Sequence, residues 1–141
     1  MIYINKNQDF EDDQEWFEGL DTSEDPDMKE AVKIQDPISS MHLAQPMIID
    51  LGTSLRHVLN TMQNNKQNCI LTIKNDKLCG ILTERDILLK VTGKGYDLDL
   101  TVIDEFITIN PEFVTPEDPL AYALNKMHIG GFRNVPVVND E

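Results

Sequence analysis

Two stretches of the chain carry apolar residues at intervals of three and four positions, the spacing of one buried helix face. These residues are Leu55, Val58, Leu59 and Met62 in the first stretch, and Leu120, Ala123, Leu124 and Met127 in the second. Short apolar runs at 47–51 and 112–115 precede the two stretches, and runs at 69–73 and 135–138 follow them. Runs of this length predict strands, so the pattern indicates a strand, a helix and a strand twice along the chain.

The second set of elements repeats the first at a constant offset. Pro46 corresponds to Pro111, which sets the offset at 65 residues. The same offset relates further identical pairs without a gap: Ile38 and Ile103, Leu55 and Leu120, Leu59 and Leu124, Asn60 and Asn125, and Met62 and Met127. We therefore predict a tandem repeat, with the first copy at residues 36–95 and the second at residues 96–141.

Residues that favour helix ends flank both predicted helices. Thr53 or Ser54 can cap the first helix through a side-chain oxygen. Asp118 followed by Pro119 is typical of a helix start, and Gly130-Gly131 is typical of a helix end. These signals place the second helix between residues 119 and 130.

The first copy continues beyond its second strand. Leu78–Leu82 predicts a further strand, which forms a hairpin through a turn at Asn75-Asp76, and residues 84–91 predict a second helix. By the offset, the second copy would need this strand and helix from about position 143, whereas the sequence ends at Glu141. We therefore expect the second copy to be incomplete as given. The alternatives are a longer natural chain, a partner chain that covers the gap, or a truncated fragment, which we favour.

The two cysteines, Cys69 and Cys79, stand on either side of the predicted turn. If residues 74 and 77 close that turn, Cys79 lies opposite Thr72 and Cys69 lies opposite residue 82. The two sulfurs are then too far apart for a disulfide, so we expect two buried thiols, as in a reducing cytoplasm.

Acidic residues are concentrated at the start of the chain. Residues 1–35 hold 11 acidic and three basic side chains, within a net charge of −13 for the whole sequence. We expect a mobile, disordered leader, which either drapes on its own domain or docks on a partner through Trp16 and Phe17. The negative charge excludes nucleic acid and anionic lipid as partners. No apolar run is long enough to span a membrane and the start lacks a signal peptide, so we expect a cytoplasmic protein.

The segment from Gly80 to Asp86 joins a buried strand to the start of a helix. Unpaired N–H groups at a helix start attract anions, and the hydroxyl of Thr83 can contact a phosphate there. Asp86, one turn into the helix, can accept two hydrogen bonds from a ribose diol. The same spacing also suits a capping box, in which Thr83 caps the helix and Asp86 reaches back, so both interpretations stay open.

Both copies resemble the cystathionine-β-synthase (CBS) domain family, whose tandem pairs form Bateman modules. Residues 80–88 (GILTERDIL) carry the resemblance in the first copy and residues 130–138 (GGFRNVPVV) carry it in the second. The resemblance covers about residues 36–141 and implies an α/β (α+β) fold, in which each repeat packs a small sheet on two helices. The sequence departs from the family in two ways: the second copy has no Gly-x-x-Thr-x-x-Asp segment, and Leu71 stands where the second copy has Pro136.

In this family the Gly-x-x-Thr-x-x-Asp segment binds an adenosine nucleotide. The resemblance therefore implies one ligand site between the repeats, with Asp86 on the ribose hydroxyls and Thr83 near a phosphate. It implies a phosphate contact for Arg133, although a solvated or structural arginine is the alternative. The implied adenine contacts are Ile48, Ile49, Cys69 and Ile70. The candidate ligands are AMP, ADP, ATP and S-adenosylmethionine, and we expect no required cofactor.

The resemblance also implies a regulatory role. Two chains are expected to form a homodimer with a flat disc of four repeats, which signals to an unidentified output protein by a change of conformation. No nucleophile has a base nearby in the sequence and the histidines lack ligand spacing, so we predict neither an enzyme nor a metal site. The alternatives are a dimerisation or protein-interaction module without a ligand, and the sensor part of a larger enzyme or transporter.

Overall fold

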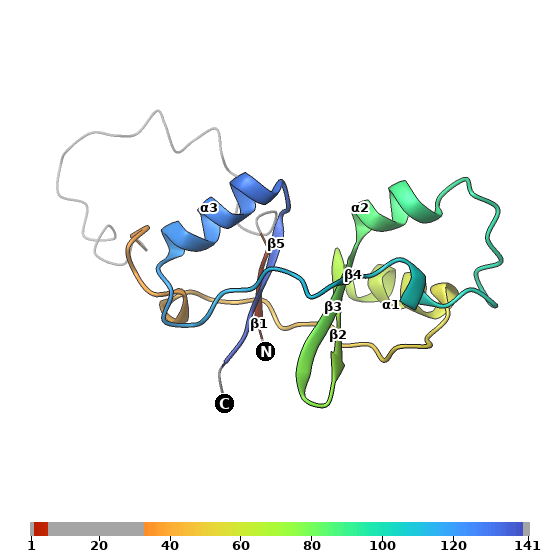
Figure 1. The fold of residues 1–141 in the computed structure, drawn as a ribbon, viewed down its shortest axis with the longest axis horizontal. Coiled ribbons are helices and arrows are strands. Elements are labelled where there is room, and N and C mark those ends of the chain that lie inside the picture. Colours follow the sequence, from red (N-terminus) through yellow and green to blue (C-terminus); the bar gives the residue numbers. More distant parts are fainter. Residues whose placement is uncertain (1, 6–32, 140–141) are drawn as a thin grey trace. The chain divides into compact units, whose positions relative to one another are not determined.

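The computed structural model describes residues 2–5 and 33–139 (Figure 1). The chain forms two compact units. Residues 45–111 make up one of them, here called the first-repeat unit, and residues 1–44 with 112–141 make up the other, here called the second-repeat unit. Within the described residues, no helix combines the length and the apolar character that crossing a membrane requires.

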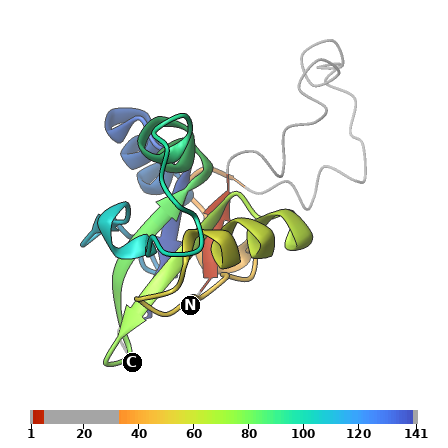
Figure 2. The ribbon, with the colours of Figure 1, turned by 90° about the vertical axis from the view of Figure 1, so that its right-hand side faces the viewer.

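The first-repeat unit is a three-stranded antiparallel sheet, in the order β2-β3-β4, with helices packed on one face. Its elements in chain order are α1 (Leu55–Asn65), β2 (Cys69–Lys74), β3 (Lys77–Thr83), α2 (Glu84–Asp86), the π-helical segment η3 (Ile87–Val91), the 3-10 helix η4 (Ile103–Glu105) and β4 (Thr108–Ile109). Figures 1 and 2 show the β2–β3 hairpin (green) with its turn directed away from α1 and α2. The predicted helix at 84–91 is therefore present, but it is α-helical for one turn and π-helical afterwards.

The cap and the apolar stripe of the sequence explain where helix α1 begins and which of its faces is buried. The hydroxyl of Ser54 accepts a hydrogen bond from the backbone N–H of His57 at 3.3 Å, which confirms a cap at one of the two predicted positions. Lys66 ends the helix in the left-handed conformation with φ of 52°. The buried face packs into a core made of Ile49, Leu55, Val58, Met62, Ile70, Leu82, Val91, Ile103 and Phe106.

The β2–β3 hairpin has its turn where the sequence predicts it. Asn75 and Asp76 both have positive φ, 52° and 59°, as a type I′ turn requires. A β-bulge then shifts the pairing between Thr72 and Ile73, so that Cys69 lies opposite Thr83. The predicted register, with Cys79 opposite Thr72 and Cys69 opposite residue 82, is therefore wrong by one residue, because Cys79 is the extra residue of the bulge. The two cysteines form no disulfide, but the prediction of two buried thiols is wrong for Cys79, which is partly exposed, whereas Cys69 is buried.

The second-repeat unit is built around a two-stranded antiparallel sheet. Its elements are β1 (Ile2–Asn5), the 3-10 helix η2 (Ile38–Ser40), α3 (Leu120–Gly130) and β5 (Asn134–Val137). Helix α3 ends at Gly131, whose φ is 65°, as predicted. Its start differs slightly: Pro119 is the N-cap, and the carboxylate of Asp118 accepts instead from the N–H of Thr115 at 2.7 Å.

Backbone hydrogen bonds repeat at the 65-residue offset, which confirms the tandem repeat in three dimensions. The N–H to O pairs are Ile49 to Leu71 and Val114 to Pro136, Leu55 to Thr101 and Leu120 to Asp36, and Ile103 to Thr53 and Ile38 to Asp118. The departure at Leu71 also has a structural role, because its N–H donates to the carbonyl of Met47 at 2.8 Å. The corresponding Pro136 has no N–H to donate.

The compact units cross the predicted repeat boundaries at 36–95 and 96–141. Residues 36–44 belong to the second-repeat unit, and residues 96–111 belong to the first-repeat unit. The reason is apolar packing: Ile38 is buried in the core with Val114, Ala123, Met127, Val135 and Val137, while Ile103 is buried with the residues around Leu55. Residues 36–44 thus complete the core of the second-repeat unit, and residues 96–111 complete the core of the first-repeat unit.

The prediction of a disordered leader over residues 1–35 is wrong for Ile2–Asn5. Residues Ile2–Asn5, at its very start, form β1 and pair with β5. Residues 6–32, which include Trp16 and Phe17, lie outside the described residues. The two alternatives for that stretch, a draped tail or a docking segment, remain predictions.

Candidate functional site

The candidate site lies in the first-repeat unit, where β3 ends and α2 begins. Thr83 is the last residue of β3 and the N-cap of α2, with extended φ and ψ of −113° and 162°. The N–H of Glu84 donates to the carbonyl of Asn68 at 2.9 Å, which ties the first residue of α2 to the start of β2. Gly80 has no room for a side chain, because a Cβ there would lie 2.7 Å from the hydroxyl of Thr72. At Gly80 the side chains of Thr72 and Ile107 fill the space that a side chain would need, and the strand then leads directly into a helix.

Thr83 and Asp86 form a complete capping box. The N–H of Asp86 donates to Oγ1 of Thr83 at 3.2 Å, and the N–H of Thr83 donates to Oδ2 of Asp86 at 3.0 Å. The hydroxyl of Thr83 also donates to Oδ2 of Asp86 at 2.7 Å. Of the two interpretations that the sequence leaves open, the capping role is thus present in the structure.

Lys90 is a third member of the site that the sequence analysis missed. Its Nζ lies 2.8 Å from Oδ1 of Asp86 and donates to the carbonyl of Phe106 at 2.9 Å. The signal was available in the sequence, because Asp86 and Lys90 are four residues apart on one helical segment. The side chain of Asp86 is 18% exposed and that of Lys90 is 42% exposed, so solvent reaches both groups.

These contacts leave part of the carboxylate of Asp86 available. An ionised carboxylate offers about four acceptor positions. The protein fills three of them, through the N–H and hydroxyl of Thr83 and the ammonium of Lys90. One ribose hydroxyl can therefore bind without a rearrangement, and a second requires Lys90 to move aside, where its ammonium could contact a phosphate.

Opposing effects act on the pKa of the Asp86 carboxyl. Burial raises the pKa, whereas hydrogen bonds from Lys90 and Thr83 and the charge of Lys90 lower it, and the net result is a pKa below the usual value. Because the folded-state pKa is lowered, the ionised carboxylate stabilises the fold at pH above the unfolded value of about 3.9. This stabilisation is lost as the pH falls through the folded-state pKa.

The Asp86→Asn variant is therefore expected to lose less stability on acidification than the wild type does. Both proteins would be unfolded with urea at a series of pH values between about 6 and 3, which brackets the ordinary carboxyl pKa. The expected result is a smaller difference in free energy of unfolding across this range for the variant. Equal slopes for the two proteins would show that the carboxylate of Asp86 does not stabilise the fold.

The predicted adenine contacts lie on both faces of the sheet. Ile48 pairs with Leu71 and Cys69 pairs with Thr83, so these four residues share one face, here called the Thr83 face. Ile49 and Ile70 lie on the opposite face, where both side chains are buried in the core with α1. The structure thus brings Ile48 and Cys69 to the same face as Thr83, and it places the side chains of Ile49 and Ile70 away from that face.

On the Thr83 face, the exposure of the two predicted contacts differs. Ile48 is 48% exposed, whereas Cys69 is 1% exposed. An exposed isoleucine offers apolar area that a flat aromatic ring could cover. Arg133 is exposed directly before β5 in the second-repeat unit, and its phosphate contact remains a prediction.

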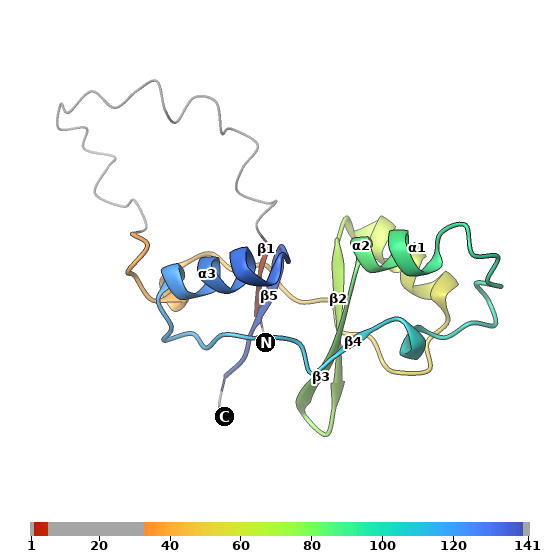
Figure 3. The same ribbon diagram turned by 45° about the horizontal axis from the view of Figure 1, so that its top comes forward.

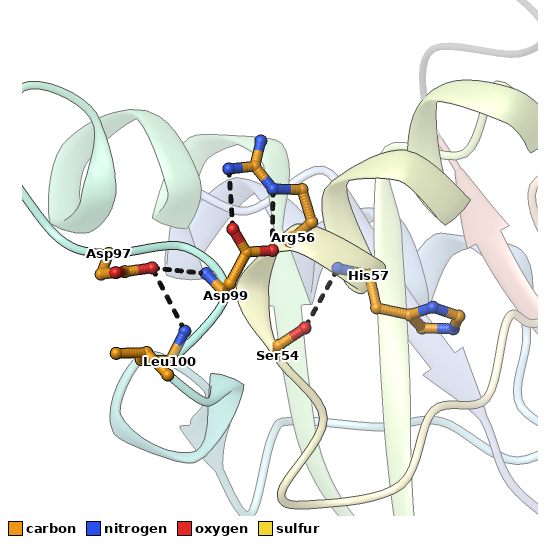
Figure 4. A network of polar contacts seen from close by, with 6 residues as sticks. All are labelled: Ser54, Arg56, His57, Asp97, Asp99 and Leu100. Carbon is orange, nitrogen blue, oxygen red and sulfur yellow. Dashed lines mark hydrogen bonds and ion pairs between the residues drawn. The ribbon is translucent and has the colours of Figure 1, made fainter.

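The other polar cluster of the first-repeat unit anchors a loop. Figure 4 shows Arg56 of α1 forming two hydrogen bonds with the carboxylate of Asp99, both at 3.1 Å. Oδ1 of Asp97 accepts from the N–H groups of Asp99 and Leu100, and the ring of His57 points away from these acids. Among residues 2–5 and 33–139, no group of three or more His, Cys, Asp or Glu side chains could hold a metal ion.

Comparison with protein families identifies the class of this fold. The model of the CBS domain matches residues 38–93 and 103–141. The chain therefore belongs to the CBS domain family and carries a tandem pair of these domains.

Curated relatives are much longer than this chain. An Arabidopsis thaliana CBS domain-containing protein, CBSCBSPB5, is 35% identical over 104 residues, which are 73% of this chain and 19% of that protein. The meiotically up-regulated gene 70 protein of Schizosaccharomyces pombe is 28% identical over 104 residues, 73% of this chain and 14% of that protein. This chain spans about a fifth, or less, of the length of these relatives.

Solved structures share the fold. The CBS domain protein PAE2072 from Pyrobaculum aerophilum, complexed with AMP, matches with a TM-score of 0.66 and 24% identity, over 74% of this chain and 79% of that one. The CBS domain pair of protein MJ0100, in complex with 5′-methylthioadenosine and S-adenosyl-L-methionine, matches with a TM-score of 0.63 and 21% identity, over 74% and 81%. These similarities confirm the predicted mixed helix-and-sheet architecture.

Proposed function

We propose that this CBS pair is a regulatory module whose first repeat binds an adenosine nucleotide at the start of α2. The observation that carries the proposal is the accessible carboxylate of Asp86, held beside Thr83 at a strand-to-helix junction, with one acceptor position left open. Pairs with the same fold have been solved with AMP and with S-adenosyl-L-methionine. AMP, ADP, ATP and S-adenosylmethionine are therefore the candidate ligands.

The proposed contacts follow from the chemistry of each group. Asp86 accepts hydrogen bonds from the ribose hydroxyls, and a hydrogen bond to a charged group contributes roughly 1.5–3 kcal/mol. Thr83 and Lys90 lie within reach of the same carboxylate, so a phosphate attached to that ribose could replace Asp86 as the partner of Lys90. Ile48 supplies an exposed apolar surface for adenine, Cys69 is buried on the same face, and Ile49 and Ile70 support the sheet from the core.

A ligand at this site can regulate only if it binds two conformations of the pair with different affinity. We infer that the module is regulatory rather than catalytic and transmits nucleotide binding to an output protein.

Homodimerisation is part of the proposal, because η3 exposes the side chains of Leu88 and Leu89, which are 63% and 61% exposed. A pocket of about 390 Å³ in the same unit is lined by Leu59 of α1, Glu84 of α2 and Ile87 of η3, among other residues. Sedimentation equilibrium is expected to show a dimer that Leu88→Asp weakens, and a monomeric wild type would contradict this.

A protein-interaction module without a ligand is the alternative function. The capping box favours it, because Thr83 and Asp86 already have a structural role, and Lys90 already neutralises the carboxylate. In that case the exposed leucines of η3 would be the functional surface, and the start of α2 would merely be a stable helix end.

A ligand panel distinguishes the two functions. Thermal unfolding of the purified chain would be followed with AMP, ADP, ATP, S-adenosylmethionine and, as the control base, GTP. A ligand that binds the native state raises the melting temperature with its concentration. We expect a rise for at least one adenosine ligand and none for GTP. No rise for any of them, in a folded protein, would favour the interaction module.

A further inference from the structure

The N-terminal strand occupies one edge of the second-repeat sheet along its whole length. β1 runs antiparallel to β5, with Ile2 opposite Val137, Tyr3 opposite Pro136, Ile4 opposite Val135 and Asn5 opposite Asn134. Figures 1 and 3 both show β1 (red) beside β5 (blue). The pairing joins residues from the two ends of the described chain.

The register of β1 on β5 reproduces the register of β3 on β2. In the first-repeat unit, Cys69, Ile70, Leu71 and Thr72 lie opposite Thr83, Leu82, Ile81 and Gly80. The 65-residue offset converts Cys69–Thr72 into Asn134–Val137, which lie opposite Asn5, Ile4, Tyr3 and Ile2. β1 therefore has the position, direction and register in the second repeat that β3 has in the first.

The backbone of β5 explains why this edge needs a partner. The carbonyl of Pro136 accepts from Val114 and the N–H of Val138 donates to Val114, so this side of β5 faces residue 114. Because backbone groups alternate along a strand, those of Val135 and Val137 point to the opposite edge, where β1 lies. All residues of β5 are buried, and buried N–H and C=O groups without a partner destabilise a fold.

We propose that this edge of β5 is a strand-binding site whose ligand is the chain's own N-terminal segment, bound in cis, and that an added peptide of the same sequence can replace it. The recognition is that of β-augmentation, in which main-chain hydrogen bonds hold an extended peptide on a sheet edge. β1 and β5 belong to one chain, so their pairing is intramolecular and an added peptide must compete with a high effective concentration of β1. The proposal is independent of nucleotide binding, which concerns the other unit.

Two proline variants test the pairing with a matched control. Proline is tolerated on an edge strand where the N–H faces away from the partner, and it breaks the pairing where the N–H faces it. Ile4 lies opposite Val135, so Ile4→Pro removes a pairing group, whereas Tyr3 lies opposite Pro136 and its N–H points outward. By amide hydrogen exchange we expect the amides of Val135 and Val137 to exchange at least about tenfold faster in Ile4→Pro and at the wild-type rate in Tyr3→Pro.

The amide of Leu71, which bonds to Met47 in the other unit, reports whether the chain remains folded and is expected not to change. Equal exchange at Val135 in both proline variants would overturn the proposal. Protection that falls when the wild type is diluted about tenfold would also overturn it, since the strand would then come from a second copy.

Peptide rescue tests the binding site itself. A chain without residues 1–5 is expected to lose the protection of Val135 and Val137 while keeping that of Leu71. A synthetic peptide of residues 1–6 should restore the protection in a concentration-dependent way, and the same peptide with proline at Ile4 should not. Failure of the natural peptide to protect these amides, at concentrations where the truncated chain is folded, would show that the edge does not bind β1 as a ligand.

Discussion

Replacement of Leu82 by alanine is expected to lower the free energy of unfolding by about 2–5 kcal/mol. Leu82 is fully buried, and it packs against Ile70 and the apolar face of α1 in the core of the first-repeat unit. Removing its side chain loses buried apolar area and leaves a cavity that the hairpin and α1 cannot close easily. Urea unfolding followed by circular dichroism measures the effect.

Leu100→Ala is the matched control, because it makes the same chemical change in the same unit at a side chain that is 81% exposed. The expected change there is within about 0.5 kcal/mol. Similar losses in the two variants would contradict the assignment of Leu82 to the core.

The Asp86→Ala variant is expected to bind adenosine nucleotide at least about tenfold more weakly, because it loses a hydrogen bond to a charged acceptor. It also loses the capping box with Thr83, so its stability should fall by about 0.5–2 kcal/mol. Isothermal titration and urea unfolding of the same preparations separate the two effects.

Ser54→Ala provides the matched control for this variant. It removes the side-chain cap of α1 in the same unit, with a similar expected loss of about 0.5–2 kcal/mol. Its affinity for nucleotide should equal that of the wild type. If Ser54→Ala weakened binding as much as Asp86→Ala did, loss of stability rather than loss of a contact would explain both results.

Local signals in the sequence predicted much of this fold. The turn at Asn75 and Asp76, the cap at Ser54 and the helix end at Gly131 each depend on the conformational preference of one or two residues. The 65-residue offset predicted equivalent elements in the two repeats, and equivalent backbone hydrogen bonds recur at the same offset.

Features that depend on distant parts of the chain were not predictable in the same way. β1 pairs with β5 across nearly the whole sequence, and nothing in residues 2–5 themselves indicates that partner. Ile38 is buried in the core of the second-repeat unit and Ile103 in the core of the first-repeat unit, and this arrangement likewise depends on packing rather than on hydrophobic periodicity. The bulge at Cys79 shifts the hairpin register by one residue, and no residue type in the turn indicates it.

At the candidate site, the sequence identified the residue types but left their contacts open. The position of Thr83 and Asp86 at a helix start followed from spacing alone, and the predicted helix also placed Lys90 one turn after Asp86, but whether the two side chains meet depends on their conformations. The face of the sheet on which Ile48 and Ile49 each lie could not be assigned without knowing that Ile48 pairs with Leu71.

Binding of a ribose diol by the carboxylate of Asp86 can be measured by comparing AMP with its 2′,3′-dideoxy analogue. Isothermal titration would be performed with the wild type and with Asp86→Ala. If Asp86 binds the ribose, the wild type prefers AMP by about tenfold or more and the variant binds the two nucleotides equally weakly. Equal affinity of the wild type for both nucleotides, or no binding of either, would contradict it.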